Sequence, residues 1–233
     1  MNWFTNFLTS SIGQKLIMSL TGLFLIIFLL VHLIGNLQLL IPDEGETFNI
    51  YAQFMTTNPV IKTVSYGLYA FILLHAFQGW LLWSKNRKAS GGGAGRYAVN
   101  NTQATQTVPG LAKNMGALGT ILFFFLLIHM YQFWFKMKIG DVPMIEYNGE
   151  EVKNLYSLVK AAFTNIGFVA FYIFSMIVIA AHLKHGFYSS FQSLGLAHKK
   201  YTPLIKTLGT LFSIIVPLLY AIIPVVFFVK HLS

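Results

Sequence analysis

The chain contains no cysteine and very little charge. The missing cysteines exclude disulfide bonds, cysteine-ligated zinc, iron–sulfur clusters held by this chain and covalent haem attachment through Cys-x-x-Cys-His. Only 10% of the 233 residues are charged, whereas soluble domains carry roughly 25%. Hydrophobic residues make up 55% of the chain. This composition excludes an ordinary soluble globular protein.

Five stretches contain no Asp, Glu, Lys or Arg at all, and each is long enough to cross a bilayer. They cover residues 16–42, 63–84, 114–135, 161–183 and 207–229. A helix that rises ~1.5 Å per residue crosses a ~30 Å hydrocarbon core in about 20 residues. We therefore predict an all-α integral membrane protein with a single domain over 1–233 and a bundle of five transmembrane helices. Their expected bounds are approximately 16–41, 61–84, 114–136, 163–187 and 206–229.

Basic residues are distributed unequally between the two sides of these helices. The side that holds the N-terminus collects ten of the 16 Lys and Arg residues, and the opposite side holds six together with all 7 acidic residues. Basic residues are enriched on cytoplasmic loops. We therefore expect a cytoplasmic N-terminus and, after five spans, a C-terminus on the outer side.

Two connections between the spans have a distinctive composition. Residues 89–112 are rich in Gly, Ser, Thr, Asn and Gln, which predicts a long flexible cytoplasmic loop. The outer connection, residues 140–155, is acidic and predicts a turn or a short hairpin.

Histidine is the distinctive ionisable residue of the apolar spans. Four of the 7 histidines lie deep in four separate spans, namely His32, His75, His129 and His182. Ionisable groups inside a membrane are energetically expensive and are therefore functional candidates by default. A single such histidine can equally serve an interhelical hydrogen bond. A proton relay is a further alternative, but relays usually recruit Asp or Glu and these spans contain neither.

Helix arithmetic sorts the four histidines into two levels. His32 and His129 lie 17 and 16 residues beyond the basic residue at the cytoplasmic end of their spans, which places both ~25 Å up, in the outer half. His75 lies 10 residues before the next basic residue at that end and His182 lies two before one, so both belong to the inner half. Two imidazoles at one height on two helices can hold the iron of a bis-His haem. The two levels predict two b haems stacked across the bilayer.

Small residues accompany three of these histidines. Gly35 follows His32 by three residues, and Gly79 and Gly186 follow His75 and His182 by four. A glycine at such a position would leave room for a flat macrocycle beside its ligand. Glycines in membrane helices also permit close helix packing, which is the alternative interpretation.

Several short segments resemble a known family. They are SSIGQK at 10–15, SLTG at 19–22, VHLIGNL at 31–37, LHAFQGW at 74–80, NRK at 86–88, HLKHGF at 182–187 and SLG at 193–195. Together they resemble the cytochrome b subunit of bacterial succinate dehydrogenase and fumarate reductase, of the type with five helices and two haems in one polypeptide. The resemblance covers essentially the whole chain and is strongest at the first, second and fourth spans.

The resemblance implies a multi-pass subunit of the bacterial inner membrane, with a periplasmic C-terminus. It implies that this subunit anchors a flavoprotein with covalent FAD and an iron–sulfur subunit on the cytoplasmic face, in a complex that allows a dimer of heterotrimers. Electrons would pass between succinate or fumarate and a quinone, usually menaquinone, without succinate chemistry on this chain. Residue by residue, His32 and His129 would ligate the distal haem, and His75 and His182 the proximal haem. His182 matches the family ligand better than its neighbour His185.

Two functional positions of the family are not matched securely. Some fumarate reductases of this type carry a glutamate two residues before the fourth ligand, linked to proton movement, and this chain has Ala180 there. A carboxylate near the start of the second helix serves quinol oxidation in related proteins, and the segment PVIK at 59–62 has none. Other candidates for quinone contact gather at the outer mouth, where a solvated acidic loop explains them equally well: Asn36, Gln38, Asp43, Glu44, Glu46 and Tyr51.

Three other classes of membrane protein were compared with this pattern. The cytochrome b of quinol–cytochrome c reductase carries two histidines on each of two helices, whereas this chain has one deep histidine per helix. A haem b anchor of another membrane dehydrogenase or hydrogenase fits the histidine pattern as well, and only the family segments quoted above separate it from the succinate dehydrogenase type. A non-haem transporter would be colourless.

Overall fold

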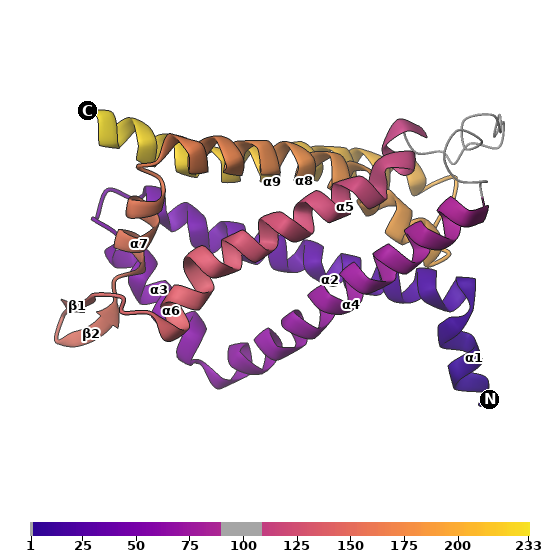
Figure 1. The fold of residues 1–233 in the computed structure, drawn as a ribbon, viewed down its shortest axis with the longest axis horizontal. Helices are drawn as coiled ribbons and strands as arrows, with labels where there is room; N and C mark the ends of the chain where they lie inside the picture. The colour runs from indigo at the N-terminus through magenta and orange to yellow at the C-terminus, as the bar shows by residue number, and fades with distance from the viewer. Residues whose placement is uncertain (1, 90–108) are drawn as a thin grey trace. The chain divides into compact units, whose positions relative to one another are not determined.

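The computed structural model describes residues 2–89 and 109–233, so most of the loop predicted at 89–112 lies outside the described residues. The elements, coloured along the chain in Figure 1, are, in order, α1 (Trp3–Thr9), α2 (Ser11–Leu37), η1 (Gln38–Leu40), α3 (Glu46–Thr57), α4 (Pro59–Ala89), α5 (Pro109–His129), η3 (Met130–Phe135), α6 (Lys136–Ile139), β1 (Met144–Tyr147), β2 (Glu150–Lys153), α7 (Leu155–Ala162), α8 (Ile166–Ser193) and α9 (Thr202–Leu232). Of these, η1 is a 3₁₀-helix and η3 a π-helix.

Five of the described helical segments are long and apolar enough to cross a membrane, as predicted. They are Ser11–Leu40, Pro59–Lys88, Asn114–Ile139, Ile166–Ser193 and Thr202–Leu232. Large apolar side chains remain exposed on all five, for example Ile27, Leu73, Leu127, Ile177 and Leu218. Such an apolar exterior is what a lipid-facing surface requires, and the chain is therefore described as a multi-pass membrane protein.

All five long helices begin at residues other than those predicted, and asparagine caps determine two of these starts. The Oδ1 of Asn58 accepts hydrogen bonds from the amides of Val60 and Ile61 at 3.0 and 3.2 Å, so α4 begins at Pro59, before the expected residue 61. The Oδ1 of Asn165 accepts from the amide of Gly167 at 2.8 Å, so α8 begins at Ile166, after the expected residue 163. Asparagine is a preferred residue at helix N-termini because its side chain satisfies free backbone amides.

The acidic outer connection contains the predicted hairpin. Strands β1 and β2 pair in antiparallel register, with Met144 opposite Lys153 and Tyr147 opposite Glu150. Asn148 and Gly149 connect them with φ angles of 55° and 87°. Both angles are positive, as a two-residue type I′ turn requires, and Asn-Gly is the sequence that adopts this turn most readily. The chain is therefore mostly helical with one small hairpin.

The structure divides into two compact units, which are described separately. The first unit comprises Met1–Ile26, Leu68–Thr120 and Ala181–Ser213. The second comprises Ile27–Gly67, Ile121–Ala180 and Ile214–Ser233. Each unit takes one segment from each of α2, α4, α5, α8 and α9. The first unit holds His75 and His182, and the second holds His32 and His129.

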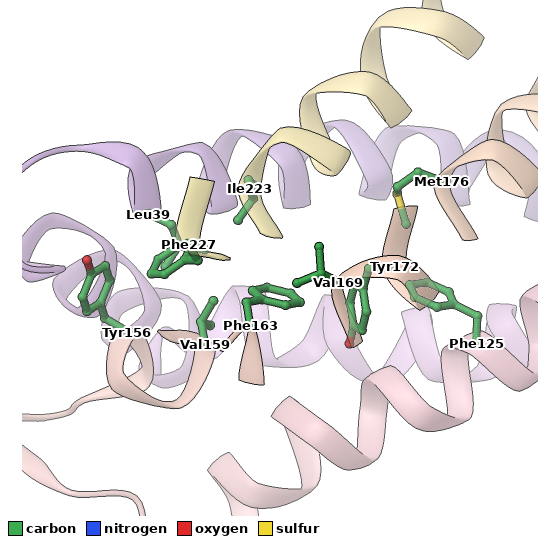
Figure 2. Close-up of a cluster of buried hydrophobic side chains, with 10 residues drawn as sticks. All are labelled: Leu39, Phe125, Tyr156, Val159, Phe163, Val169, Tyr172, Met176, Ile223 and Phe227. Carbon is green, nitrogen blue, oxygen red and sulfur yellow. The ribbon is translucent and has the colours of Figure 1, made fainter. Parts of the chain in front are cut away.

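The apolar core described for the second unit is largely aromatic. Its buried members are Leu39, Phe125, Tyr156, Val159, Phe163, Val169, Tyr172, Met176, Ile223 and Phe227. Figure 2 shows the ring of Tyr172 between the side chains of Phe163 and Phe125, with ring centres 5.0 and 5.3 Å from it in edge-to-face contacts. Aromatic pairs favour this geometry, which fixes the orientation of the Tyr172 ring.

Asn49 connects three elements of the second unit through its amide side chain. The Oδ1 atom accepts a hydrogen bond from the backbone amide of Tyr156 at 3.0 Å, and the Nδ2 atom donates to the hydroxyl of Tyr147 at 3.1 Å and to Oδ1 of Asn154 at 3.3 Å. Only 1% of Asn49 is exposed. This one residue of α3 therefore joins β1 and the start of α7.

Replacing Asn49 by Ala should destabilise the protein, because it leaves the buried amide of Tyr156 without an acceptor. The expected loss is about 1–3 kcal/mol, or several degrees in Tm for a chain of this size. Thr63→Ala is the matched control, since the Thr63 hydroxyl is exposed and donates to the Pro59 carbonyl oxygen of its own helix. Thermal unfolding in detergent should separate the two variants, and equal Tm values would contradict the structural role of Asn49.

Candidate functional site

The first unit brings two of the predicted histidines together. His75 on α4 and His182 on α8 have ring centres 6.3 Å apart, with an interplanar angle of 68°. Both residues are half-buried. These are the two histidines that helix arithmetic places at the inner level.

The second unit brings the other two together. His32 on α2 and His129 at the end of α5 have ring centres 5.9 Å apart, with an interplanar angle of 89°. Both are half-buried. The predicted pairs are therefore adjacent in the structure, each within one unit.

The two separations fit the donor set of a bis-imidazole metal site. A metal–imidazole bond is about 2.0–2.1 Å and a ring nitrogen lies about 1 Å from the ring centre, so two imidazoles on opposite sides of one ion have centres roughly 6 Å apart. The observed 5.9 and 6.3 Å agree with this spacing. Two ligands per ion are fewer than a protein-only site needs, and no group of three or more candidate ligands exists among the described residues. Each pair thus supplies two imidazole donors.

His75 has a defined hydrogen-bond partner at Nδ1. The Thr21 hydroxyl lies 3.2 Å from Nδ1 of His75 and 2.8 Å from the carbonyl oxygen of Ile17. A carbonyl oxygen can only accept, so the single hydroxyl proton goes to Ile17 and the hydroxyl oxygen accepts from Nδ1–H of His75. This arrangement leaves the lone pair of His75 on Nε2, the atom that would bind a metal.

His129 is held in the same way by a tyrosine. The Tyr172 hydroxyl donates to Oε1 of Gln132 at 2.6 Å and lies 3.3 Å from Nδ1 of His129. Because its proton is already donated to Gln132, the phenolic oxygen accepts from Nδ1–H. The lone pair of His129 is therefore also on Nε2. A hydrogen bond at the distal ring nitrogen is the usual way in which proteins orient a metal-binding histidine.

The remaining two histidines differ from this pattern. Nδ2 of Asn36 lies 3.4 Å from Nδ1 of His32 and donates more closely, at 2.7 Å, to the His32 carbonyl oxygen one turn earlier. Nδ1 of His182 is buried without a hydrogen-bond partner among the described residues. Each pair thus contains one histidine whose Nδ1 contacts a hydroxyl group from another helix.

The glycines near the histidines have different roles. A Cβ on Gly22 would lie 3.3 Å from the His75 ring, so this glycine allows α2 to approach it. A Cβ on Gly35 would collide with the Tyr51 ring, and one on Gly79 would touch Met18. Gly186 has no described atom within 4 Å of such a Cβ. The predicted role of making room beside a ligand therefore fits Gly186, whereas Gly35 and Gly79 accommodate other side chains.

Polar groups line the part of the first unit near the ends of α2, α4 and α8. Nζ of Lys85 donates to Oε1 of the buried Gln14 at 2.8 Å. His185 lies three residues after His182, and its Nδ1 is buried without a partner in the described part of the chain.

The polar residues of the outer mouth serve largely local structure. The Asp43 carboxylate accepts hydrogen bonds from the Thr47 hydroxyl and amide and from the Gly45 amide. The bonds from Thr47 hold the pKa of Asp43 below its usual value, so this carboxylate is ionised where it bonds to the first turn of α3. Oε1 of Gln38 is buried and has no partner in the residues described. Among the predicted quinone contacts in the described residues, Gln38 has a buried oxygen that accepts no hydrogen bond. The carboxylate of Asp43 already accepts three.

Sequence reasoning missed the groups that orient the ligands. Thr21 lies in the SLTG segment, and Gln132 and Tyr172 are isolated polar residues in two different spans. A glutamine within an apolar span could have indicated such a group, because its side chain needs a hydrogen-bond partner inside the membrane.

Comparison of the chain with models of known protein families, with characterised proteins and with solved structures found no match.

Proposed function

We propose that this chain is the di-haem cytochrome b anchor of a succinate:quinone oxidoreductase. The single observation that carries the haem part is the pairing of four intramembrane imidazoles, at 5.9 Å for His32 with His129 and 6.3 Å for His75 with His182. The assignment to succinate dehydrogenase or fumarate reductase rests on the family segments of the sequence, among them VHLIGNL at 31–37 and LHAFQGW at 74–80.

The role of this chain in the reaction is to carry electrons across the membrane. When bound, each haem supplies one-electron transfer between the iron–sulfur subunit and menaquinone. The two imidazoles of each pair would hold one haem, which would supply one-electron transfer and not oxygen binding. Thr21 and Tyr172 hold protons at Nδ1 of their histidines, which keeps Nε2 available for coordination.

Partner and substrate assignments can be tested on the native complex. The full-length chain, tagged at its C-terminus, is purified from its own membranes in mild detergent. We expect a second subunit with covalently bound flavin, visible as fluorescence in an acid-treated gel, and succinate-dependent reduction of a menaquinone analogue. A haem-containing preparation without covalent flavin, active with hydrogen or formate instead, would assign the chain to another dehydrogenase.

The proposed orientation predicts which loops face the cytoplasm. Reporter fusions at Gly92, which lies outside the described residues, and at Asn148 in the hairpin turn should report cytoplasm and periplasm respectively, because basic residues concentrate on the first side. The reverse result would place the His75–His182 pair at the outer level and contradict the proposed docking side of the iron–sulfur subunit.

A further inference from the structure

The second unit contains a hydrogen-bonded chain of three side chains inside the membrane-spanning segments. It runs from Gln132 through Tyr172 to His129, over distances of 2.6 and 3.3 Å. Tyr172 is 6% exposed and Gln132 is 7% exposed. Polar groups at such positions are retained at an energetic cost and usually serve a function. This series of hydrogen bonds ends at His129, one of the four candidate ligands.

Two features of the fold hold these three side chains in place. Gln132 lies in the π-helix η3, which begins directly after His129, and π-helical turns are frequent at functional sites. The Tyr172 ring is fixed by edge-to-face contacts with Phe163 and Phe125 (Figure 2). The phenolic oxygen is therefore positioned by packing, and its proton is committed to Gln132.

We propose that Tyr172, with its proton held by Gln132, is a positioning residue that sets the reduction potential of the haem bound by His32 and His129. This inference rests on the proposed function. Accepting the Nδ1–H bond gives His129 partial imidazolate character and makes Nε2 a stronger donor. A stronger axial donor stabilises the ferric iron, so the hydrogen bond lowers the potential of this haem.

Tyr220 provides a matched control within the same unit. It is also a tyrosine of a membrane-spanning helix, and its ring centre lies 6.0 Å from that of His32. Its hydroxyl donates to the backbone carbonyl oxygen of Leu29 at 2.7 Å. Tyr220→Phe therefore removes an equivalent hydroxyl beside the same histidine pair without removing the bond to Nδ1 of His129.

The test is a redox titration of the purified full-length protein, followed by the haem absorbance. In Tyr172→Phe we expect both haems to be retained and the potential of the His32–His129 haem to rise. The ratio of reduced to oxidised haem at the wild-type midpoint should increase three- to tenfold, which for one electron is about 28 to 59 mV. Tyr220→Phe should shift this potential by less than Tyr172→Phe does. Gln132→Met should raise the potential, also by less than Tyr172→Phe does. The component is identified as the one lost in His129→Ala.

Several results would overturn the inference. One is an unchanged potential in Tyr172→Phe, and another is an equal shift in Tyr220→Phe. If Tyr172→Phe fails to accumulate, Gln132→Met decides alone, and an unchanged or lower potential there contradicts the proposal. Failure of the proposed function is distinguishable: if the haem assignment fails, the wild-type protein contains no haem to titrate, and if only the succinate assignment fails, the haem potentials still respond as predicted while the preparation lacks covalent flavin.

Discussion

Alanine at His75 or at His182 should remove one and the same haem, and alanine at His32 or at His129 should remove the other. Each pair lies within a single compact unit and has a separation that fits one iron, 6.3 Å in the first unit and 5.9 Å in the second. Losing either imidazole would remove half of the protein donors that hold the haem of that pair. We expect the haem content to fall from two to one per chain in each single variant.

The measurement is a haem count with low-temperature difference spectra of the four purified variants. His198→Ala is the control, since His198 caps a turn at the Lys200 amide and belongs to neither pair. Two spectral patterns should result, one shared by the His75 and His182 variants and one by the His32 and His129 variants. Loss of the same component in His75→Ala and His129→Ala would refute the pairing.

His182 and its neighbour His185 should respond in opposite ways to substitution. On a helix His185 lies about 60° round the axis and ~4.5 Å along it, so both cannot coordinate one iron from the same side. The His182 ring is the one that faces His75, and Gly186 leaves space beside it. We expect His182→Ala to abolish the inner haem, and His185→Gln to retain it with a shifted potential because a nearby polar group has changed.

The same spectra test this assignment. Haem loss in His185→Gln, together with a normal low-spin spectrum in His182→Ala, would exchange the two roles. Glutamine at position 185 keeps a hydrogen-bonding side chain, so we expect the variant to fold. A change in its haem spectrum then reports on the site itself.

Much of the fold follows from the sequence because membrane helices are governed by few constraints. Charge-free runs of sufficient length predicted the five long helices, and the acidic composition of residues 140–155 predicted a turn or short hairpin there, whose turn the structure places at Asn148 and Gly149. The exact starts at Pro59 and Ile166 were not predicted, since they depend on which asparagine side chain captures free amides.

The candidate site was predictable only in part. The four histidines could be paired from their heights, because helix rise converts sequence distance into depth. Their hydrogen-bond partners could not be predicted, since Thr21 with His75 and Tyr172 with His129 lie on different helices whose rotation the sequence pattern does not fix. The glycine at 35 was misleading for a similar reason, because the residue that fills the space beside it, Tyr51, comes from α3.

The measurement that tests the account most directly is a reduced-minus-oxidised spectrum of the purified chain with a haem count. We expect two b haems per chain, both low-spin, because each of the two imidazole pairs would hold one haem through two histidines. A colourless protein, purified intact from membranes with an adequate haem supply, would contradict it.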